Sequence, residues 1–309
     1  MFWNKSKDKD EVNVRRGYHG TGALWWEAPY VNGRRHGVEK IYLESGALYV
    51  ETPFVNGKIH GMEKFYNESG SVCVEAPYEN GKKHGIDKGY YDSGALEWEH
   101  PYVNGVMQGK VKHYYESGAL WWEVTYVNGK DHGILTNYYE SGALKHVTPY
   151  KKGKIHGIEK GYHYESPNPL FRKTPYKNGK IHGIEKEYYF SGELYREISY
   201  KKGKKHGIAK VYYKSGALLS AVMYKNGKRY GTFKGFFESG ALGYEIPYKK
   251  GRRHGIEKRY FESGSLSAEV PYVNGRRYGK EKNYGPSGAL KLEILYEDGK
   301  KPEIKRYRY

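Results

Sequence analysis

Gly118–Ser141 reads GALWWEVTYVNGKDHGILTNYYES, and variants of this stretch fill most of the chain from Gly22 onward. Its first glycine recurs every 24 residues, apart from one interval of 50 between Gly142 and Gly192. With one degenerate copy inside that interval, the chain contains twelve repeats. A fixed period of this length is typical of architectures in which each repeat contacts only its neighbours.

Each repeat carries two turn signals. One is a Ser-Gly-Ala-Leu-like segment, as at Ser45-Gly46, and the other is usually Asn-Gly-Lys, as at Asn32-Gly33. The runs between them are rich in Tyr, Val, Ile and Trp, and none shows a helical stripe. Two turns per 24 residues, flanked by such runs, predict two short strands in each repeat.

The apolar pattern favours three-residue loops at both turns, each a type I turn followed by a left-handed glycine. This choice pairs Tyr30 with Arg34 and Tyr42 with Leu48. It also predicts one shared apolar face, which contains Leu24, Ala28, Tyr30, Val38 and Tyr42.

We therefore predict an all-β fold, an elongated, twisted single antiparallel β-sheet meander of about twelve 24-residue β-hairpins. Residues 1–17 form a charged N-terminal lead or cap, and Val14–Tyr18 already matches the second strand of a repeat. Residues 18–301 form the array, with an irregular repeat near 163–175 that contains Pro167 and Pro169. Residues 302–309 form a basic tail or a closing strand.

Composition favours a thin, solvated body. The hydrophobic content is 38%, the mean hydropathy is −0.90, and the chain has 41 glycines. The single Cys73 excludes an internal disulfide framework. Residues 1–16 lack the apolar stretch of a signal peptide, and no segment approaches the roughly 20 apolar residues of a membrane span. These features predict a cytoplasmic protein with no transmembrane segment.

The run Tyr126–Gly133, YVNGKDHG, resembles the core signature of MORN (membrane occupation and recognition nexus) repeats. The longer repeat with Ser-Gly-Ala-Leu is similar to a MORN variant common in bacterial proteins, some of them described as antitoxin-like. The resemblance covers residues 18 to about 301 and implies a protein-interaction scaffold, with phospholipid binding as a second implied activity. The repeat's His is replaced at Gln108, Tyr230 and Tyr278.

Charge is distributed unevenly over a chain with a formal net charge of +18. The Ser-Gly turns carry acidic residues such as Glu44 and Glu262, whereas the Asn-Gly turns carry most of the cations. Around these turns, the first five hold six Lys or Arg residues and the last seven hold twenty. The basic edge that we predict includes Lys151, Lys152, Lys154, Lys201, Lys202, Lys204, Lys205, Lys249, Lys250, Arg252 and Arg253.

Two interpretations of this edge stay open. It attracts an anionic partner, with an acidic protein ahead of anionic lipid and nucleic acid, or its lysines are simply solvated and keep the sheet soluble. Nucleic acid is less favoured because the aromatic residues lie mid-strand, away from the cations at the turns. Vesicle binding separates the protein and lipid alternatives.

A second candidate surface is aromatic. Five tryptophans occupy variable mid-strand positions in the first five repeats: Trp25, Trp26, Trp98, Trp121 and Trp122. They either widen the packing of the ribbon or form a partner-binding surface, because Trp is enriched at binding hot spots. Later repeats hold polar or basic residues at these positions, as at Lys145 and Arg196.

Recurring His and Glu residues predict no metal or catalytic site. Equivalent histidines such as His36 and His60 lie two strands apart, about 9.6 Å, too far for one zinc ion with roughly 2 Å bonds. The glutamates, as at Glu27, recur in most repeats and define no single site. We predict no cofactor and no enzyme, because the glycines have turn spacing and no nucleophile or phosphate-loop motif occurs.

The sequence thus predicts a non-enzymatic repeat scaffold for protein–protein interaction, with an antitoxin or immunity role implied only by the resemblance. The alternative is peripheral binding to anionic phospholipid membranes through the basic turn edge.

Overall fold

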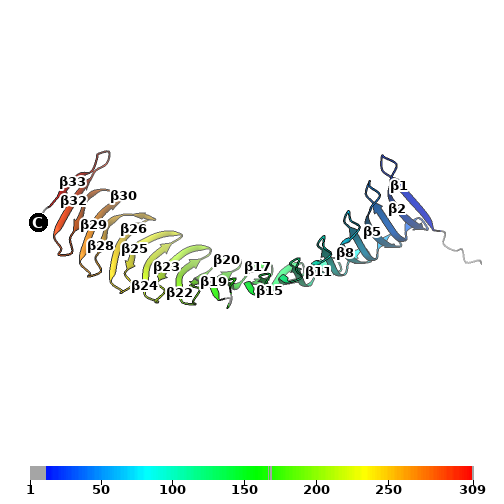
Figure 1. Ribbon diagram of the computed structural model, residues 1–309, viewed down its shortest axis with the longest axis horizontal. Helices are drawn as coiled ribbons and strands as arrows, with labels where there is room; N and C mark the ends of the chain where they lie inside the picture. The colour runs from blue at the N-terminus through cyan, green and yellow to red at the C-terminus, as the bar shows by residue number, and fades with distance from the viewer. Residues whose placement is uncertain (1–11, 166, 168, 308–309) are drawn as a thin grey trace, which may run out of the picture. The chain divides into compact units, whose positions relative to one another are not determined.

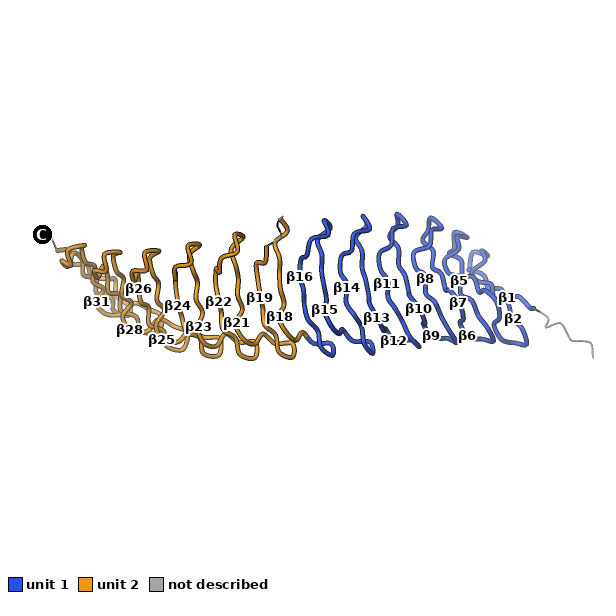
Figure 2. The backbone as a smooth tube through the Cα atoms, turned by 90° about the horizontal axis from the view of Figure 1, so that it is seen from below, with its two compact units in different colours: residues 1–154 blue, residues 155–309 orange. Residues whose placement is uncertain are grey.

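The computed structural model describes residues 12–165, 167 and 169–307, and these contain strands and turns. All of their strands belong to one antiparallel sheet, which confirms the predicted fold class. The chain divides into two compact units, residues 1–154 (unit 1) and 155–309 (unit 2) (Figure 2). Within each unit, hairpin follows hairpin in chain order (Figure 1).

Each repeat begins with a long strand and returns through a second one. The first strands are β2 (Leu24–Val31), β5 (Leu48–Val55), β8 (Val72–Glu79), β11 (Leu96–Val103), β14 (Leu120–Val127), β16 (Leu144–Lys151), β19 (Leu170–Lys177), β22 (Leu194–Lys201), β24 (Leu218–Lys225), β26 (Leu242–Lys249), β29 (Leu266–Val273) and β32 (Leu290–Tyr296). The second strands are β4 (Gly37–Tyr42), β7 (Gly61–Tyr66), β10 (Gly85–Tyr90), β13 (Gly109–Tyr114), β15 (Lys130–Tyr138), β18 (Gly157–Tyr162), β21 (Gly183–Tyr188), β23 (Lys204–Tyr212), β25 (Lys228–Phe236), β28 (Gly255–Tyr260) and β31 (Gly279–Tyr284).

Two-residue segments follow most Asn-Gly turns, and one strand flanks the repeats at each end. The short segments are β3 (Arg34–Arg35), β6 (Lys58–Ile59), β9 (Lys82–Lys83), β12 (Val106–Met107), β17 (Lys154–Ile155), β20 (Lys180–Ile181), β27 (Arg252–Arg253) and β30 (Arg276–Arg277). The flanking strands are β1 (Asn13–Tyr18), paired with β2, and β33 (Glu303–Arg306), paired with β32. The predicted lead at 1–11 and the last two residues lie outside the described part, as do Ser166 and Asn168 of the irregular repeat.

The Ser-Gly turn forms as predicted. Gly46 has a φ of 87°, its N–H donates to the Leu43 carbonyl at 2.8 Å, and the Leu43 N–H donates to the Ala47 carbonyl at 2.8 Å. Tyr42 pairs with Leu48. This is a three-residue loop in which only glycine takes the left-handed position without strain.

The Asn-Gly turn differs from the prediction. Tyr30 pairs with Arg35 and Val31 with Arg34, so Asn32-Gly33 is a two-residue turn, and the predicted Tyr30–Arg34 pair is wrong. Both central residues have positive φ, 50° at Asn32 and 76° at Gly33, as a type I′ turn requires.

This register also corrects the predicted apolar face. Trp26 pairs with Ile41 and Glu27 with Lys40, so Ala28 and Tyr30 lie on one side of the sheet. Val38 and Tyr42 lie on the other side with Glu27, and the Tyr42 hydroxyl donates to Glu27 Oε1 at 3.1 Å. We name the two sides the Ala28 face and the Glu27 face, after these residues and their equivalents in every repeat.

The buried residues of this single-layer sheet lie on the Ala28 face. Ala28 and Val111 are fully buried, and acidic residues such as Glu39 and Asp87 are nearly so. Four of these acids pair with a cation four residues earlier, as Arg35 does with Glu39 at 3.1 Å. The exception is Glu185, which has Ile181 in that position and accepts a hydrogen bond from the Thr174 hydroxyl at 3.3 Å. Buried charge needs such a partner, because an unpaired charge in this environment is costly.

The His-Gly step has a steric cause. Gly37 has a φ of 113°, and a Cβ there would lie 2.7 Å from Pro29 Cγ. The His36 N–H donates to the Pro29 carbonyl at 2.9 Å and closes the bend between β3 and β4. A glycine is required because the backbone and the proline ring both exclude a side chain.

Candidate functional site

Cations face each other directly at the Asn-Gly turns of unit 2. In four successive turns, the two residues that pair across the turn are both basic. The pairs are Lys177–Lys180, Lys201–Lys204, Lys225–Lys228 and Lys249–Arg252. Like charges in directly opposed positions destabilise a hairpin. All eight side chains are exposed.

Unit 1 avoids this arrangement in its first five turns. Its pairs are Val31–Arg34, Val55–Lys58, Glu79–Lys82, Val103–Val106 and Val127–Lys130. The hairpin geometry is the same in both units, so the turn itself does not require opposed cations. The sixth turn of unit 1, Lys151-Lys152-Gly153-Lys154, has the same sequence as the turn at Lys201–Lys204. The opposed cations are therefore a local property of the repeats from Lys151 onward.

Two turns of unit 2 carry a further cation in an unfavourable backbone position. Lys202 has a φ of 50° and Lys250 a φ of 52°, where neighbouring turns have Asn178 and Asn226. Asn tolerates the left-handed region better than Lys does. Both lysines thus add charge to the turn at the expense of backbone stability.

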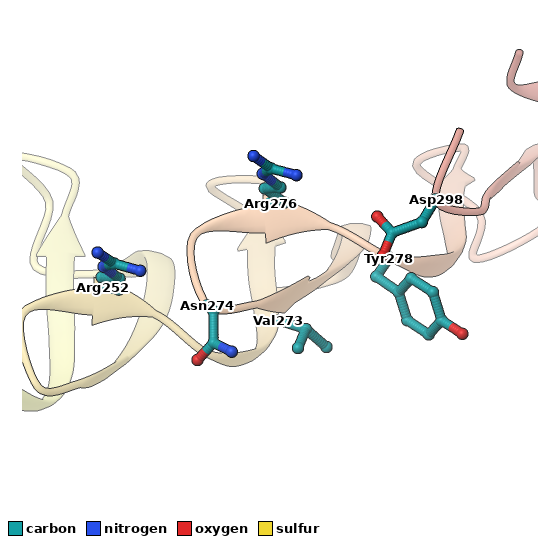
Figure 3. A pocket seen from close by; sticks show the side chains of 6 residues that line it. All are labelled: Arg252, Val273, Asn274, Arg276, Tyr278 and Asp298. Carbon is teal, nitrogen blue, oxygen red and sulfur yellow. The ribbon is translucent and has the colours of Figure 1, made fainter. Parts of the chain in front are cut away.

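Successive turns stack along this edge. The Gly275 N–H donates to the Arg253 carbonyl of the preceding repeat at 2.8 Å, and the same bond recurs at Gly203, Gly227 and Gly251. A Cβ added to Gly275 would lie 3.9 Å from Arg252 Cβ, so this turn also contacts the stem of the preceding cation. Figure 3 shows Arg252 and Arg276 on neighbouring turns, with their guanidinium groups on the same side. These two arginines, with Val273, Asn274, Tyr278 and Asp298, line a hollow of about 430 Å³. Equivalent cations recur every two strands, or about 9.6 Å.

We call this surface the basic turn edge. It comprises Lys177, Lys180, Lys201, Lys202, Lys204, Lys225, Lys228, Lys249, Lys250, Arg252 and Arg276. None of these residues takes part in an ion pair of the described chain. An array of exposed, unneutralised cations attracts anions over roughly 10 Å at 0.1 M salt.

The tryptophans of unit 1 do not form one surface. Trp25 and Trp121 are exposed at 49% and 41%, whereas Trp26, Trp98 and Trp122 lie half-buried on the Ala28 face. Trp26 covers Gly17 and Trp98 covers Gly89, where an added Cβ would lie 2.2 Å from the indole in each case. An aromatic ring that packs over a glycine on the neighbouring strand stabilises a sheet, so Trp26 and Trp98 have a structural role.

Trp98 and Trp122 are joined by two histidines. Trp98 stacks on His100 with centroids 4.3 Å apart, and His113 stacks on Trp122 at 4.1 Å. The two imidazoles meet with their Nε2 atoms 2.9 Å apart, so one nitrogen donates and the other accepts. Burial, followed by the nearby His100, lowers the pKa of His113 to about 4. The neutral pair is therefore part of the folded packing.

This pair makes stability fall in acid. The folded His113 has a lower pKa than the unfolded residue, so its contribution is present above about pH 6.5 and is lost as pH falls toward 4. The contribution is about 1–2 kcal/mol after allowance for partial exposure. We expect His113→Phe, which copies Phe65 at the equivalent position, to flatten the decline in urea midpoint between pH 6.5 and 4.5. An equally steep decline in the variant would contradict this role.

On the Glu27 face, the recurring glutamates accept hydrogen bonds from tyrosines. Tyr66 donates to Glu51 at 2.7 Å, and Lys40 lies 3.4 Å from the same carboxylate. Burial, then the hydrogen bond to Glu51, raises the pKa of Tyr66 to about 12. The same Tyr–Glu contact recurs at Tyr42–Glu27, Tyr90–Glu75, Tyr114–Glu99, Tyr212–Glu197, Tyr260–Glu245 and Tyr284–Glu269. Each Tyr–Glu bond joins the two long strands of one repeat, and the Lys40–Glu51 ion pair adds a contact with the neighbouring repeat.

Comparison with known families agrees with this architecture. Seven segments match the family described as MORN repeat variant, at residues 35–56, 59–80, 107–128, 131–152, 181–202, 205–226 and 253–274. The chain is built from MORN-variant repeats. Each matched segment begins two residues after the glycine of one Asn-Gly-type turn and ends at the residue before the glycine of the next such turn. No curated protein matches the chain.

Several solved structures have some likeness to these MORN-variant repeats. The TcdB2-TccC3 crystal structure is 12% identical, with 94% of this chain and 18% of that chain covered and a TM-score of 0.19. The TcdB2-TccC3-Cdc42 crystal structure is 13% identical, with 92% of this chain and 19% of that chain covered and a TM-score of 0.19. The Photorhabdus luminescens Tc holotoxin pore is 13% identical, with 97% of this chain and 18% of that chain covered and a TM-score of 0.17. The chain spans less than a fifth of their length, and at these TM-scores the likeness carries no argument about function.

The basic residues predicted from the sequence fall into three groups within the MORN-variant array. Lys201, Lys202, Lys204, Lys249, Lys250 and Arg252 belong to the basic turn edge. Lys205 and Arg253 lie on the Ala28 face, where Lys205 is 5.4 Å from the Tyr224 ring centroid and Arg253 is 2.9 Å from Glu257. Lys151, Lys152 and Lys154 belong to unit 1.

Five residues of the basic turn edge were missing from the prediction: Lys177, Lys180, Lys225, Lys228 and Arg276. The signal for the four lysines was the Lys-Asn-Gly-Lys spacing, which a type I′ turn converts into directly opposed cations. The assumption of a three-residue loop hid that pairing. Arg276 became visible only through the stacking of successive turns.

The histidines of the MORN-variant repeat have a structural contact. His60 Nδ1 lies 3.4 Å from the Asn80 N–H, and Gln108 Oε1 accepts from the Asn128 N–H at 2.9 Å. The side chain in this position therefore receives a backbone N–H of the next Asn-Gly turn, and Gln108 replaces His in that role. No group of three or more metal-binding side chains occurs in the described part of the chain. Nor does any helix there have the length and apolar character to cross a bilayer.

Proposed function

We propose that this MORN-variant chain is a non-enzymatic scaffold that binds an acidic protein through the basic turn edge of unit 2. The observation that carries the proposal is the run of four turns with directly opposed cations, Lys177–Lys180 to Lys249–Arg252. Each pair lowers the stability of the free chain, and an anionic partner relieves that repulsion on binding.

An acidic protein suits the geometry better than the other anions. Most aromatic side chains lie on the strand faces, whereas the cations of this edge lie at the turns. Of the described residues, only Tyr230 and Tyr278 are exposed aromatic side chains beside these cations, so bases have few rings on which to stack. Anionic lipid remains the alternative. We also keep the cytoplasmic location as part of the proposal, and the antitoxin role implied by the family resemblance stays a prediction.

The test replaces one lysine of each opposed pair by the residue that unit 1 uses. We expect the fourfold variant Lys177→Val, Lys201→Val, Lys225→Val and Lys249→Val to be more stable by about 1–3 kcal/mol in total, because four like-charge contacts are removed. We also expect it to bind poly-L-glutamate at least tenfold more weakly in fluorescence anisotropy at 100 mM salt. A gain in stability together with a loss of binding is the signature of functional residues placed against local preference.

A matched control removes four cations from the strands of unit 2. Lys186→Thr, Lys210→Thr, Lys234→Thr and Lys258→Thr lowers the net charge by the same amount, and Thr136 occupies the equivalent position in unit 1. This control should keep most of the poly-L-glutamate affinity. Equal losses in both variants would mean that net charge alone drives binding.

Vesicle flotation decides between protein and lipid. Binding to phosphatidylserine vesicles but not to poly-L-glutamate, abolished in the fourfold valine variant, would replace the protein proposal by the lipid alternative. Equal binding to single-stranded DNA and to poly-L-glutamate would reduce the edge to a nonspecific polyanion surface.

A further inference from the structure

Cations of the Ala28 face obey a rule from repeat to repeat. Where the second residue after the glycine of an Asn-Gly-type turn is basic, it lies over the aromatic ring of the next repeat, as Arg35 lies 5.1 Å from the Phe54 centroid. Ile59, Met107, Asp131, Ile155 and Ile181 occupy this position in the other repeats before the last one. The same contact recurs at Lys83–Tyr102, Lys205–Tyr224, Arg229–Tyr248, Arg253–Tyr272 and Arg277–Tyr296, at 5.2–5.4 Å. In four of these repeats the cation also pairs with the acid four residues later. A complete set therefore contains a ring, a carboxylate and a cation.

The repeat of Tyr126 has the ring and the carboxylate without the cation. Met107 stands where a cation would cover Tyr126, Asp131 takes the place of Arg35, and Leu135 takes the place of Glu39. In the part of the chain that the structure describes, Asp131 belongs to no ion pair and no cation lies over Tyr126. The carboxylate of Asp131 and the ring face of Tyr126 are therefore both available to a ligand.

A groove connects this position with the tryptophan. Its volume is about 350 Å³, and its lining includes Asp131 and Tyr126 at one end, Val124 and Leu135 in the middle, and Trp122 at the other end. Trp122 and Tyr126 are four residues apart on β14, or about 13 Å along the strand. The groove is therefore charged at one end and apolar in the middle, and at the other end Trp122 lies beside the polar Asn137.

Tyr126 holds the carboxylate in place. Burial, followed by the hydrogen bond to Asp131, raises the pKa of Tyr126 to about 12. The hydroxyl stays protonated at neutral pH and donates to Asp131, which keeps further acceptor capacity. The tyrosine ring face remains free for a cation, which is attracted by the ring quadrupole.

We propose that this groove of unit 1 binds a primary ammonium group on an apolar chain. The ammonium supplies the missing cation beside Asp131 and over Tyr126, and the chain lies on Val124 and Leu135 and ends at Trp122. A free alkylamine and a lysine side chain of another protein share this chemistry. The inference does not depend on the basic turn edge, which lies in unit 2 and has the opposite charge.

The test uses the full chain and the indole N–H signals of its six tryptophans in NMR spectra. Trp122→Phe assigns the relevant signal, and n-hexylammonium, methylammonium and 1-hexanol serve as ligands. We expect the Trp122 signal to shift in a saturable way with n-hexylammonium, and the affinities for methylammonium and 1-hexanol to be at least tenfold weaker. Trp26 is the internal control, because it occupies the same position in a repeat that has Arg35 instead of an acid.

Asp131 variants separate charge from shape. Asp131→Asn should weaken n-hexylammonium binding at least tenfold and leave 1-hexanol unchanged, whereas Asp131→Glu should stay within a few-fold of the native chain. Equal affinity for 1-hexanol, unchanged binding in Asp131→Asn, or the lack of a saturable shift would overturn the proposal. A blocked lysine peptide that shifts Trp122 identifies a protein side chain as the source, and a response to n-hexylammonium alone identifies a free amine.

Discussion

Val111→Glu should lower the stability of unit 1 by about 3–5 kcal/mol at pH 7, because it buries a charge without a partner. Val111 is fully buried at a position where other repeats hold Glu39 or Asp87. Those acids have Arg35 and Lys83 four residues earlier, whereas Val111 has Met107. The urea midpoint of the unit 1 transition measures the effect.

A second substitution in the same chain should restore most of the loss. Met107→Arg recreates the cation–acid spacing of Arg35 and Glu39, so the double variant should show a coupling free energy of about 1.5–3 kcal/mol. Burial raises the pKa of Asp87 even beside Lys83, so the carboxyl group introduced in the single variant should also bind a proton and cost less at pH 4.5 than at pH 7. A single variant as stable as the native chain, or a double variant without recovery, would refute the pairing rule.

Gly85→Ala should destabilise unit 1 by about 2–4 kcal/mol, through backbone strain and a steric clash. Gly85 has a φ of 119°, and a Cβ there would lie 2.9 Å from Pro77 Cγ. Thermal unfolding and native-state hydrogen exchange of β8 and β10 measure the loss.

The control is a glycine whose backbone is left-handed but whose surroundings are open. Gly94 has a φ of 83° and nothing within 4 Å of an added Cβ, so Gly94→Asn should cost less than about 1 kcal/mol. Pro77→Ser added to Gly85→Ala removes the ring and copies Ser199 beside Gly207, and it should recover the steric part alone. Equal costs at Gly85 and Gly94 would show that the proline contact is unimportant.

The spacing of the glycines was sufficient to predict the hairpins, because Gly46 and its equivalents need positive φ at a fixed place in each repeat. The Asn-Gly turn was predicted wrongly because all apolar residues were assigned to one face. In a single-layer sheet both faces carry packed side chains: Tyr30 lies over the Ala28 face, and Tyr42 reaches Glu27 on the other. When both faces of a sheet carry packed apolar side chains, alignment of the apolar residues alone does not determine the strand register.

The candidate sites depended on that register. The opposed cations of Lys201 and Lys204 appear only when the turn has two residues. The stacking of Trp98, His100, His113 and Trp122 depends on diagonal neighbours across three strands, which the spacing within one strand does not show. Asp131 stands where equivalent repeats have a cation such as Arg35. Its role could be inferred only after the structure showed that this cation lies over an aromatic ring.

The pairing of every long strand with its immediate neighbours in the chain has a genetic consequence. Removal or duplication of 24 residues in phase, for example from Gly94 to Ser117, joins two ends that already fit each other, since each repeat presents the same turn and the same row of partners. One recombination event can thus change the number of repeats while the contacts between neighbouring repeats stay the same. Surfaces on either side of the event would keep their chemistry and change only their distance from one another.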